Sequence, residues 1–159
     1  MQDRYLFKAK RKDDGEWVIG NRIDDGVTGQ VFIHAVGNSV NESDKVGEEG
    51  CLQFVAFEVA PSTICQCTGL KDKNGNLIWE NDIVKFEDLG EEGYEYKEGF
   101  DFENKARVEF TEGRWSLTDF VSDNSGVIDE MYNHAEFMNL WGECEVIGNV
   151  FDNPELLEV

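Results

Sequence analysis

The stretch Thr68–Glu87, TGLKDKNGNLIWENDIVKFE, decides the expected fold because its local chemistry encodes a two-stranded turn. Asn74-Gly75 at its centre is typical of a type I′ hairpin turn, in which both central residues adopt positive φ. Apolar runs follow at Leu77–Trp79 and Ile83–Phe86. The stretch therefore predicts a hairpin and then a further strand.

Similar apolar runs, separated by turn residues, recur along the rest of the chain. Strands are expected at Tyr5–Ala9, Glu16–Gly20, Gln30–Val36, Cys51–Val59, Thr63–Thr68, Lys105–Phe110, Arg114–Phe120 and Glu143–Val150. A polar loop is expected at 37–50, and helical spacing of apolar residues predicts one short helix near 127–140. This pattern favours a mostly β fold, a small barrel or sandwich of short antiparallel strands.

Six apolar residues in these strand patterns are predicted to lie in the core. They are Trp17, Phe54, Ile83, Val84, Trp115 and Val146. With 159 residues and 40% hydrophobic residues, the chain is long enough to bury such a core as a single domain over 1–159. It lacks a run of the roughly 20 apolar residues that a spanning helix needs, and its start is not typical of a secretory signal. We therefore expect a cytoplasmic protein with no membrane association.

The charge of the chain is extreme: 14 basic against 34 acidic residues give a formal net charge of −20. So negative a surface repels phosphate backbones, and direct nucleic-acid binding is disfavoured. Basic residues cluster once, in Lys8–Lys12. In a strand, Lys8, Lys10 and Lys12 share a face, which is typical of a solvated sheet edge that lysines protect from aggregation and less so of a docking patch.

Acidic and aromatic residues alternate in the segment 87–103. Eight acidic residues stand there against Lys97, and the aromatics are Tyr94, Tyr96, Phe100 and Phe102. Two interpretations stay open. The segment either folds back on its own barrel, or protrudes as a flap whose aromatics are covered by a second copy or by a partner protein.

Cysteine and histidine spacing predicts no metal, cofactor or catalytic site. Cys65-Gln66-Cys67 is one Cys-x-Cys pair and Cys51 and Cys144 are isolated, whereas structural zinc sites usually present two Cys-x₂₋₄-Cys knuckles. Neither His34 nor His134 has a motif partner. We expect reduced thiols and no catalytic, cofactor-binding or metal-ligating residues.

Asp82 is the one carboxylate with a distinctive position, since it follows a turn and precedes an apolar strand. A carboxylate there commonly accepts backbone N–H bonds and locks the turn. The alternative is a surface contact to a partner. The candidate partner-contact residues are thus Tyr94, Tyr96, Phe100, Phe102 and Asp82.

Three blocks of the chain resemble the YopX family, which is encoded largely by bacteriophages and prophages. They are YLFKAK at 5–10 with GEWV at 15–18, TGLKDKNG at 68–75 with ENDIV at 80–84, and VIGN at 146–149 with NPELL at 153–157. The chain departs at Asn81, where the family more often has Gly, and in Leu89–Phe102, which looks like an insertion. The resemblance implies a β-rich phage accessory protein, with an SH3-like or YopX-like fold, in the cytoplasm of the bacterial host. It carries over no catalytic residues.

The function expected from these observations is a non-enzymatic protein-binding or assembly module, acting through a protein partner or self-association. The alternative is an acidic nucleic-acid mimic that antagonises a host DNA- or RNA-binding protein, which the charge of −20 suggests. An enzyme is the least expected class.

Overall fold

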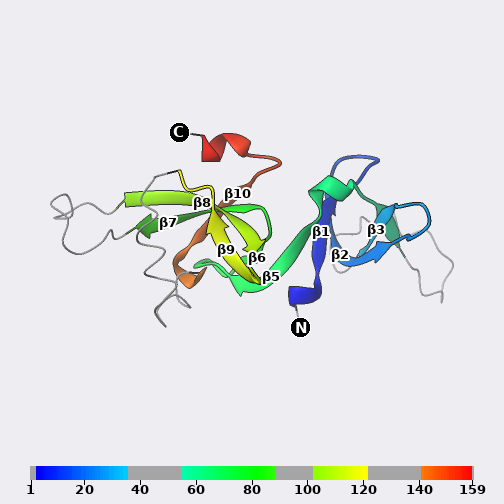
Figure 1. The fold of residues 1–159 in the computed structure, drawn as a ribbon, viewed down its shortest axis with the longest axis horizontal. Coiled ribbons are helices and arrows are strands. Elements are labelled where there is room, and N and C mark those ends of the chain that lie inside the picture. Colours follow the sequence, from blue (N-terminus) through cyan, green and yellow to red (C-terminus); the bar gives the residue numbers. More distant parts are fainter. Residues whose placement is uncertain (1–2, 36–54, 89–101, 122–140, 159) are drawn as a thin grey trace. The chain divides into compact units, whose positions relative to one another are not determined.

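Strands dominate the computed structural model, which describes residues 3–35, 55–88, 102–121 and 141–158 (Figure 1). Within these ranges, helix is limited to three short 3-10 segments and residues 141–143. This confirms the mostly β class. The predicted helix near 127–140 lies outside the described residues.

The described strands form two open antiparallel sheets rather than a closed barrel. Their orders are β4-β3-β2-β1-β5-β6 and β10-β7-β8-β9. The barrel alternative is therefore wrong for these residues, whereas the SH3-like or YopX-like form of the fold stays a prediction.

The first of two compact units runs from Met1 to Cys67. Its elements are η1 (Asp3–Tyr5), β1 (Phe7–Lys10), β2 (Trp17–Asp24), β3 (Val31–Ala35), β4 (Ala56–Glu58), η4 (Pro61–Thr63) and the start of β5 (Cys65–Lys71). Strand β1 pairs with β2 on one side and with β5 on the other. Beyond β1, Arg11 bridges to Val59, so the sheet curls until the ends of β1 and β4 meet. The core inside this curl consists of Ala9, Val18, Val31, Ile33 and Val59.

Gly20 allows the curl because β3 passes directly over its α-carbon. A Cβ built at Gly20 would lie 1.8 Å from the backbone oxygen of His34 and 2.6 Å from its carbonyl carbon. These atoms belong to the paired strand, so they cannot move aside as a flexible side chain could. The backbone of β2 can therefore approach β3 this closely only without a side chain at position 20.

The second unit runs from Thr68 to Val159. It contains the end of β5, β6 (Leu77–Trp79), β7 (Asp82–Asp88), β8 (Phe102–Thr111), β9 (Arg114–Thr118), β10 (Glu145–Asn149) and η5 (Pro154–Leu157). Its buried core draws on both sheets and consists of Ile78, Val84, Phe86, Ala106, Val108, Leu117, Trp141 and Cys144. The strands predicted on either side of Glu80-Asn81 are confirmed as β6 and β7.

The turn between β5 and β6 is not of the predicted type I′. Gly75 has φ 81°, but Asn74 is not among the residues with positive φ. The amide of Gly75 donates to the carbonyl of Asp72 at 3.0 Å, and the amide of Asp72 donates to the carbonyl of Asn76 at 2.9 Å. This is a three-residue loop closed by a glycine bulge. Only Gly75 therefore needs the left-handed conformation.

The carboxylate of Asp72 explains why this longer loop forms. Its Oδ1 accepts the amides of Asn74 and Asn76, both at 2.9 Å, and its Oδ2 accepts the amide of Val146 at 3.0 Å. Asp72 is 5% exposed. Burial alone would raise the pKa of Asp72, but the hydrogen bonds from Val146, Asn76 and Asn74 together lower it below its ordinary value. One buried charge thus connects the loop to the start of β10.

The core predictions are confirmed in part. Ile83 and Val84 are fully buried, whereas Trp115 and Val146 are partly buried against the second core. Phe54 lies outside the described residues. Trp17 is wrong as a core residue, because it is only half-buried and does not belong to the core cluster of the first unit.

The expectation of a single domain over 1–159 stays a prediction, since two packed cores do not show whether either unit folds alone. The expected loop at 37–50 lies outside the described residues. So does most of the segment 87–103, but its ends are strand residues that continue the β7–β8 pair as far as Asp88 and Phe102. The segment is therefore inserted between two paired strands.

In the Gly20→Ala variant, the first unit should unfold much more easily than in a variant with a matched substitution. We expect the variant to lose roughly 3 kcal/mol of unfolding free energy, because its methyl group overlaps the backbone of β3. Gly26→Ala is the control, since a Cβ there meets nothing within 4 Å. Urea titration of both variants measures the difference, and equal midpoints would contradict the close approach at Gly20.

Asp72→Asn should destabilise the protein by roughly 2 kcal/mol at pH 7, because a neutral amide cannot accept the same set of amides. The folded-state pKa of Asp72 is lowered, so the contribution of the carboxylate is present above about pH 4 and is lost as the pH falls through that lowered pKa. Urea titrations of both proteins from pH 7 to pH 2 should therefore show a constant difference that shrinks only below about pH 4. A difference that does not change with pH would argue against this role.

Candidate functional site

The sheet of the first unit has a second apolar side, which we call the outer face. Side chains of paired residues in an antiparallel sheet point to the same side, and alternate residues point to opposite sides. The register therefore places one set of residues opposite Ala9 and Val18 of the core. The set includes Lys8, Lys10, Trp17, Ile19, Ile23 and Phe32, and the polar pair Asn21 and His34 lies on the same side, between Ile19 and Ile23 on β2 and beside Phe32 on β3.

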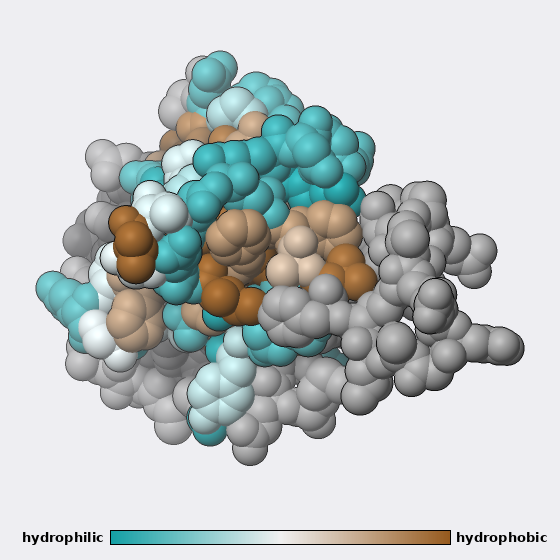
Figure 2. Space-filling view, turned by 90° about the vertical axis from the view of Figure 1, so that its right-hand side faces the viewer, coloured by the Kyte–Doolittle hydropathy of each residue, from teal (hydrophilic) through white to brown (hydrophobic). Residues whose placement is uncertain are grey.

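The apolar members of the outer face remain partly accessible. None of them belongs to the core cluster, and Ile23 is 37% exposed. In the space-filling view from the side on which β3 lies, hydrophobic residues gather next to a band of hydrophilic ones (Figure 2). A sheet with apolar residues on both sides has more apolar surface than its own core uses, which is a common property of interaction surfaces.

Two lysines flank the indole ring of the outer face. The Nζ atom of Lys8 lies 4.9 Å from the centroid of the Trp17 ring, and that of Lys10 lies 5.4 Å from it. Contacts at these distances are cation–π interactions, which hold the ammonium groups over the ring. The interpretation of these lysines as a protected sheet edge is wrong, because β1 has paired strands on both sides.

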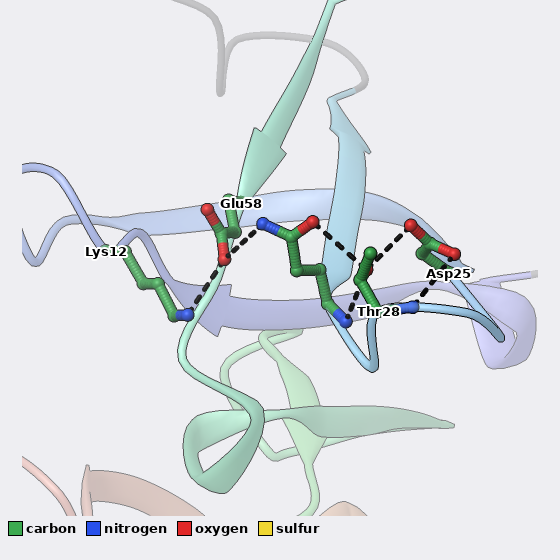
Figure 3. Close-up of polar contacts among 5 residues, drawn as sticks. Lys12, Asp25, Thr28 and Glu58 are labelled. Atoms are coloured by element: carbon green, nitrogen blue, oxygen red, sulfur yellow. Dashed lines mark hydrogen bonds and ion pairs between the residues drawn. The ribbon is translucent and has the colours of Figure 1, made fainter.

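Lys12 takes part in a different structure, a chain of polar contacts beside the sheet (Figure 3). Its Nζ atom lies 2.8 Å from Oε1 of Glu58, which also accepts from Nε2 of Gln30 at 3.2 Å. The ammonium group of Lys12, followed by the Gln30 amide, lowers the pKa of the Glu58 carboxyl. The chain connects β4 to the loop that joins β2 and β3.

The β2–β3 loop is itself held by Asp25. Its Oδ2 accepts from the hydroxyl of Thr28 at 2.6 Å, and its Oδ1 accepts from the amide of Val27 at 2.9 Å. The Thr28 hydroxyl, followed by the amides of Val27 and Thr28, lowers the pKa of Asp25. Val27 is 95% exposed. An ordered loop therefore presents an apolar side chain next to the strands that carry Ile23 and Phe32.

The second unit also exposes an aromatic residue, at the turn between β8 and β9. Phe110 is 52% exposed, and its ring meets the Trp115 ring edge-on with centroids 5.0 Å apart. The turn is formed by Glu112 and Gly113, with φ values of 52° and 82°. This is the type I′ pattern, so the predicted hairpin over these residues is confirmed.

Asp82 and Asn81 form the corner between β6 and β7. Oδ2 of Asp82 accepts the amide of Trp79 at 2.8 Å, and Asp82 is only 2% exposed. This is the turn-locking role expected from the sequence. Asn81 has φ 68°, a conformation that asparagine tolerates, and Arg107 donates to its Oδ1 at 2.7 Å. Because Asp82 is buried and binds a backbone amide of the turn, we do not propose it as a partner contact.

The other candidate contact residues are not placed by the structure. Tyr94, Tyr96 and Phe100 lie outside the described residues. The backbone of Phe102 begins β8 and pairs with Asp88. Their role as partner contacts stays a prediction.

The described thiols are buried and not joined in disulfides. Burial, with the nearby charges of Glu143 and Asp72, raises the pKa of the Cys144 thiol to about 12. Cys144 is therefore protonated at neutral pH and a poor nucleophile. Cys51 and His134 lie outside the described residues. Within the described part of the chain, no group of three or more His, Cys, Asp or Glu could hold a metal ion.

Negative charge is divided unevenly between the two units. The first unit has 7 basic and 11 acidic residues, and the second has 7 and 23, which gives net charges of −4 and −16. The sum is the −20 of the whole chain. Any electrostatic attraction to a basic partner is therefore concentrated in the second unit.

Sequence reasoning missed the outer face because it assigned Trp17 to the core. The signal that could have found it is the alternation of Lys8, Ala9 and Lys10, which assigns the lysines to one side and the alanine to the other. Once Lys10 pairs with Trp17, the indole must lie with the lysines. The pairing of Lys10 with Trp17 could not be predicted from the sequence of either strand alone.

Comparison with known proteins relates nearly the whole chain to one family. The family model described as YopX protein matches residues 6–158. The crystal structure of protein EF1440 from Enterococcus faecalis is similar over 96% of each chain, with 23% sequence identity and a TM-score of 0.47. No curated protein matches the chain. In the ranges that the structure describes, no helix is long and apolar enough to cross a membrane.

Trp17→Ala and Val18→Ala should test the assignment of neighbouring residues to opposite sides of the sheet. Trp17→Ala should cost about 1 kcal/mol of unfolding free energy, which includes the contacts with the two lysines. Val18 is fully buried, so Val18→Ala should cost roughly 2–3 kcal/mol although it removes far fewer atoms. Urea titration at low protein concentration measures both, and the reverse order would place Trp17 in the core.

Proposed function

The chain belongs to the YopX protein family, and from this premise we propose that it is a phage accessory protein that works as a non-enzymatic protein-binding module in the bacterial cytoplasm. The resemblance of the sequence to a phage and prophage family supports the origin. The outer face of the first unit supports the binding role.

The outer face is the single observation that carries this proposal. Trp17, Ile19, Ile23 and Phe32 lie on one side of a sheet whose other side packs on the core of the first unit. Burying such side chains against a partner stabilises a complex by roughly 25 cal/mol per Å² of apolar area removed from water. Aromatic residues are also enriched where binding energy concentrates at protein interfaces.

The ordered β2–β3 loop supports the same role. Its polar contacts run from Asp25 to Lys12, as Figure 3 shows, so the loop needs little further ordering when a partner binds. A preorganised surface loses less conformational entropy on association.

Nucleic-acid mimicry is the second candidate, and the charge of the second unit favours it. A net charge of −16 over one unit would attract the basic surface of a DNA- or RNA-binding protein. The two candidates differ in the surface that binds and in their response to salt.

A pull-down from host lysate with matched variants would separate the candidates. Ile23→Asp places a charge on the outer face, and Tyr5→Asp makes a matched change at a 56% exposed position in η1, outside the outer face. We expect wild type and Tyr5→Asp to retain a partner that Ile23→Asp loses. The partner should stay bound at about 1 M salt, where the Debye length is only about 3 Å, because the contact is mainly apolar.

The contrary results are equally specific. A partner that all three proteins capture, and that about 1 M salt releases, would favour the mimic instead. A partner that resists salt but ignores Ile23→Asp would show that binding uses a different surface. Failure of all three proteins to enrich any partner over a blank matrix would contradict the proposed role.

A further inference from the structure

We infer that two copies of this chain pair edge to edge through the second half of β2, around a two-fold axis at Ile23. The inference goes beyond the proposed function, because it concerns self-association through a strand edge rather than binding of a partner protein to the outer face. Three observations carry it: an open backbone edge, opposite charges that alternate along this edge, and an accessible isoleucine between them.

The second half of β2 has a neighbouring strand on one side only. Strand β1 ends where Phe7 pairs with Gly20, whereas β2 continues to Asp24. The four residues from Asn21 to Asp24 are all exposed, and β3 pairs with them on one side. On the other side, no strand of the described ranges pairs with them. Residues 21–24 therefore form an open edge in line with β1.

The hydrogen-bond pattern shows which backbone groups point to this edge. The amide of Asp25 donates to the carbonyl of Gln30 at 2.9 Å, so Asp25 directs its backbone groups toward β3. Backbone direction alternates along a strand, so Ile23 also points to β3, whereas Arg22 and Asp24 point to the open edge. Among the described residues, nothing pairs with the backbone amides and carbonyls of Arg22 and Asp24. These donors and acceptors can bind an added strand.

The side chains on this edge are complementary to a second copy of themselves. Arg22 and Asp24 lie on the same side of β2, and the guanidinium contacts the carboxylate at 2.8 and 2.9 Å. An antiparallel register that places Arg22 opposite Asp24 of the second copy does so twice, because the axis is two-fold. Each of these two pairs exchanges two backbone hydrogen bonds and joins opposite charges. Each arginine then keeps its own carboxylate and gains a second one.

Other antiparallel registers of the same edge are less favourable. If Arg22 were opposite Arg22 of the second copy, or Asp24 opposite Asp24, like charges would meet and only one pair of residues would exchange backbone hydrogen bonds. A longer register is also blocked, since Gly20 already pairs with Phe7. The sequence of the edge thus selects one register.

Ile23 lies at the centre of this register, opposite Ile23 of the second copy. Its side chain is 37% exposed and belongs to the outer face. The central pair is of the type without hydrogen bonds, in which the α-carbons are about 4.5 Å apart and the side chains are closest. Pairing therefore removes apolar surface of both isoleucines from water, while the charged pairs lie on the opposite side of the joined sheets.

Charge repulsion does not prevent this contact. Charged residues protect many sheet edges, but they do so by repelling a second copy, and opposite signs at alternate positions lack this effect. Two chains of −20 repel one another as a whole, yet the edge belongs to the unit with a net charge of −4. The Debye length of about 8 Å at physiological salt weakens repulsion between more distant charges.

Charge-reversal variants test the register. Sedimentation equilibrium at about 0.15 M salt should show reversible dimerisation of wild type, two 18.1 kDa chains, with a Kd below about 1 mM. Arg22→Asp and Asp24→Arg should each dimerise at least about tenfold more weakly, because each places like charges opposite one another. An equal mixture of the two variants should form a heterodimer, because the acidic edge of one faces the basic edge of the other.

Matched controls and hydrogen exchange locate the contact. Lys71→Asp and Glu158→Arg make the same charge changes at exposed positions of the second unit and should dimerise like wild type. Circular dichroism and urea titration must show that every variant is folded. In wild type, amide exchange at Arg22 and Asp24 should slow as the protein concentration rises, whereas exchange at Ile23, which points to β3, should stay constant.

Several results would overturn the inference. These are a wild type that is monomeric at about 1 mM, a mixture of the two variants that stays monomeric while wild type dimerises, and a dimer without slower exchange at Arg22 and Asp24. If wild type is monomeric but Arg22→Asp loses a lysate partner, the edge binds a strand of another protein and the second copy is wrong. The proposed function is judged separately, because its partner should be lost with Ile23→Asp and kept with Arg22→Asp.

Discussion

The second unit depends on one buried carboxylate. Asp72 accepts two amides of its own loop and the amide of Val146, so it joins a local turn to a strand that begins more than seventy residues later. Hydrogen bonds to a buried charge are worth more than those to neutral groups, and leaving them unmade is costly. The hairpin of β5 and β6 and the edge strand β10 are therefore stabilised together, and the core that includes Ile78 and Val84 forms between them.

Much of the fold was predictable because strand positions follow from local patterns. The pairing of strands was not predictable, and the wrong predictions for the Asn74-Gly75 turn and for Trp17 arose from it. Asn74-Gly75 indicated a type I′ turn, but the Asp72 carboxylate favours a longer loop, and this depends on a residue near position 146. Trp17 looked like core until its partner in β1 was known. The outer face could not be predicted for the same reason, since a face exists only when strands are in register.

The two units divide the physical properties that a binding protein needs. The first unit has little net charge and an apolar side that its own core does not use. The second unit has most of the negative charge, which keeps a protein soluble and discourages wrong partners. If one surface were both apolar and strongly acidic, binding through it would be weaker, because carboxylates on the outer face would be desolvated on binding. This separation is consistent with the proposed role in protein recognition.

Strand β5 has a consequence for how this protein could have evolved. The border between the units falls between Cys67 and Thr68, in the middle of β5 rather than in a linker. The amide of Cys67 donates to the carbonyl of Leu6 in the first unit, whereas the hydroxyl of Thr68 donates to the carbonyl of Ile78 in the second. Recombination between genes would have to cut through a paired strand to exchange either unit. Exchange of one unit alone would break backbone and side-chain hydrogen bonds of β5, and this physical cost favours inheritance of the two units together.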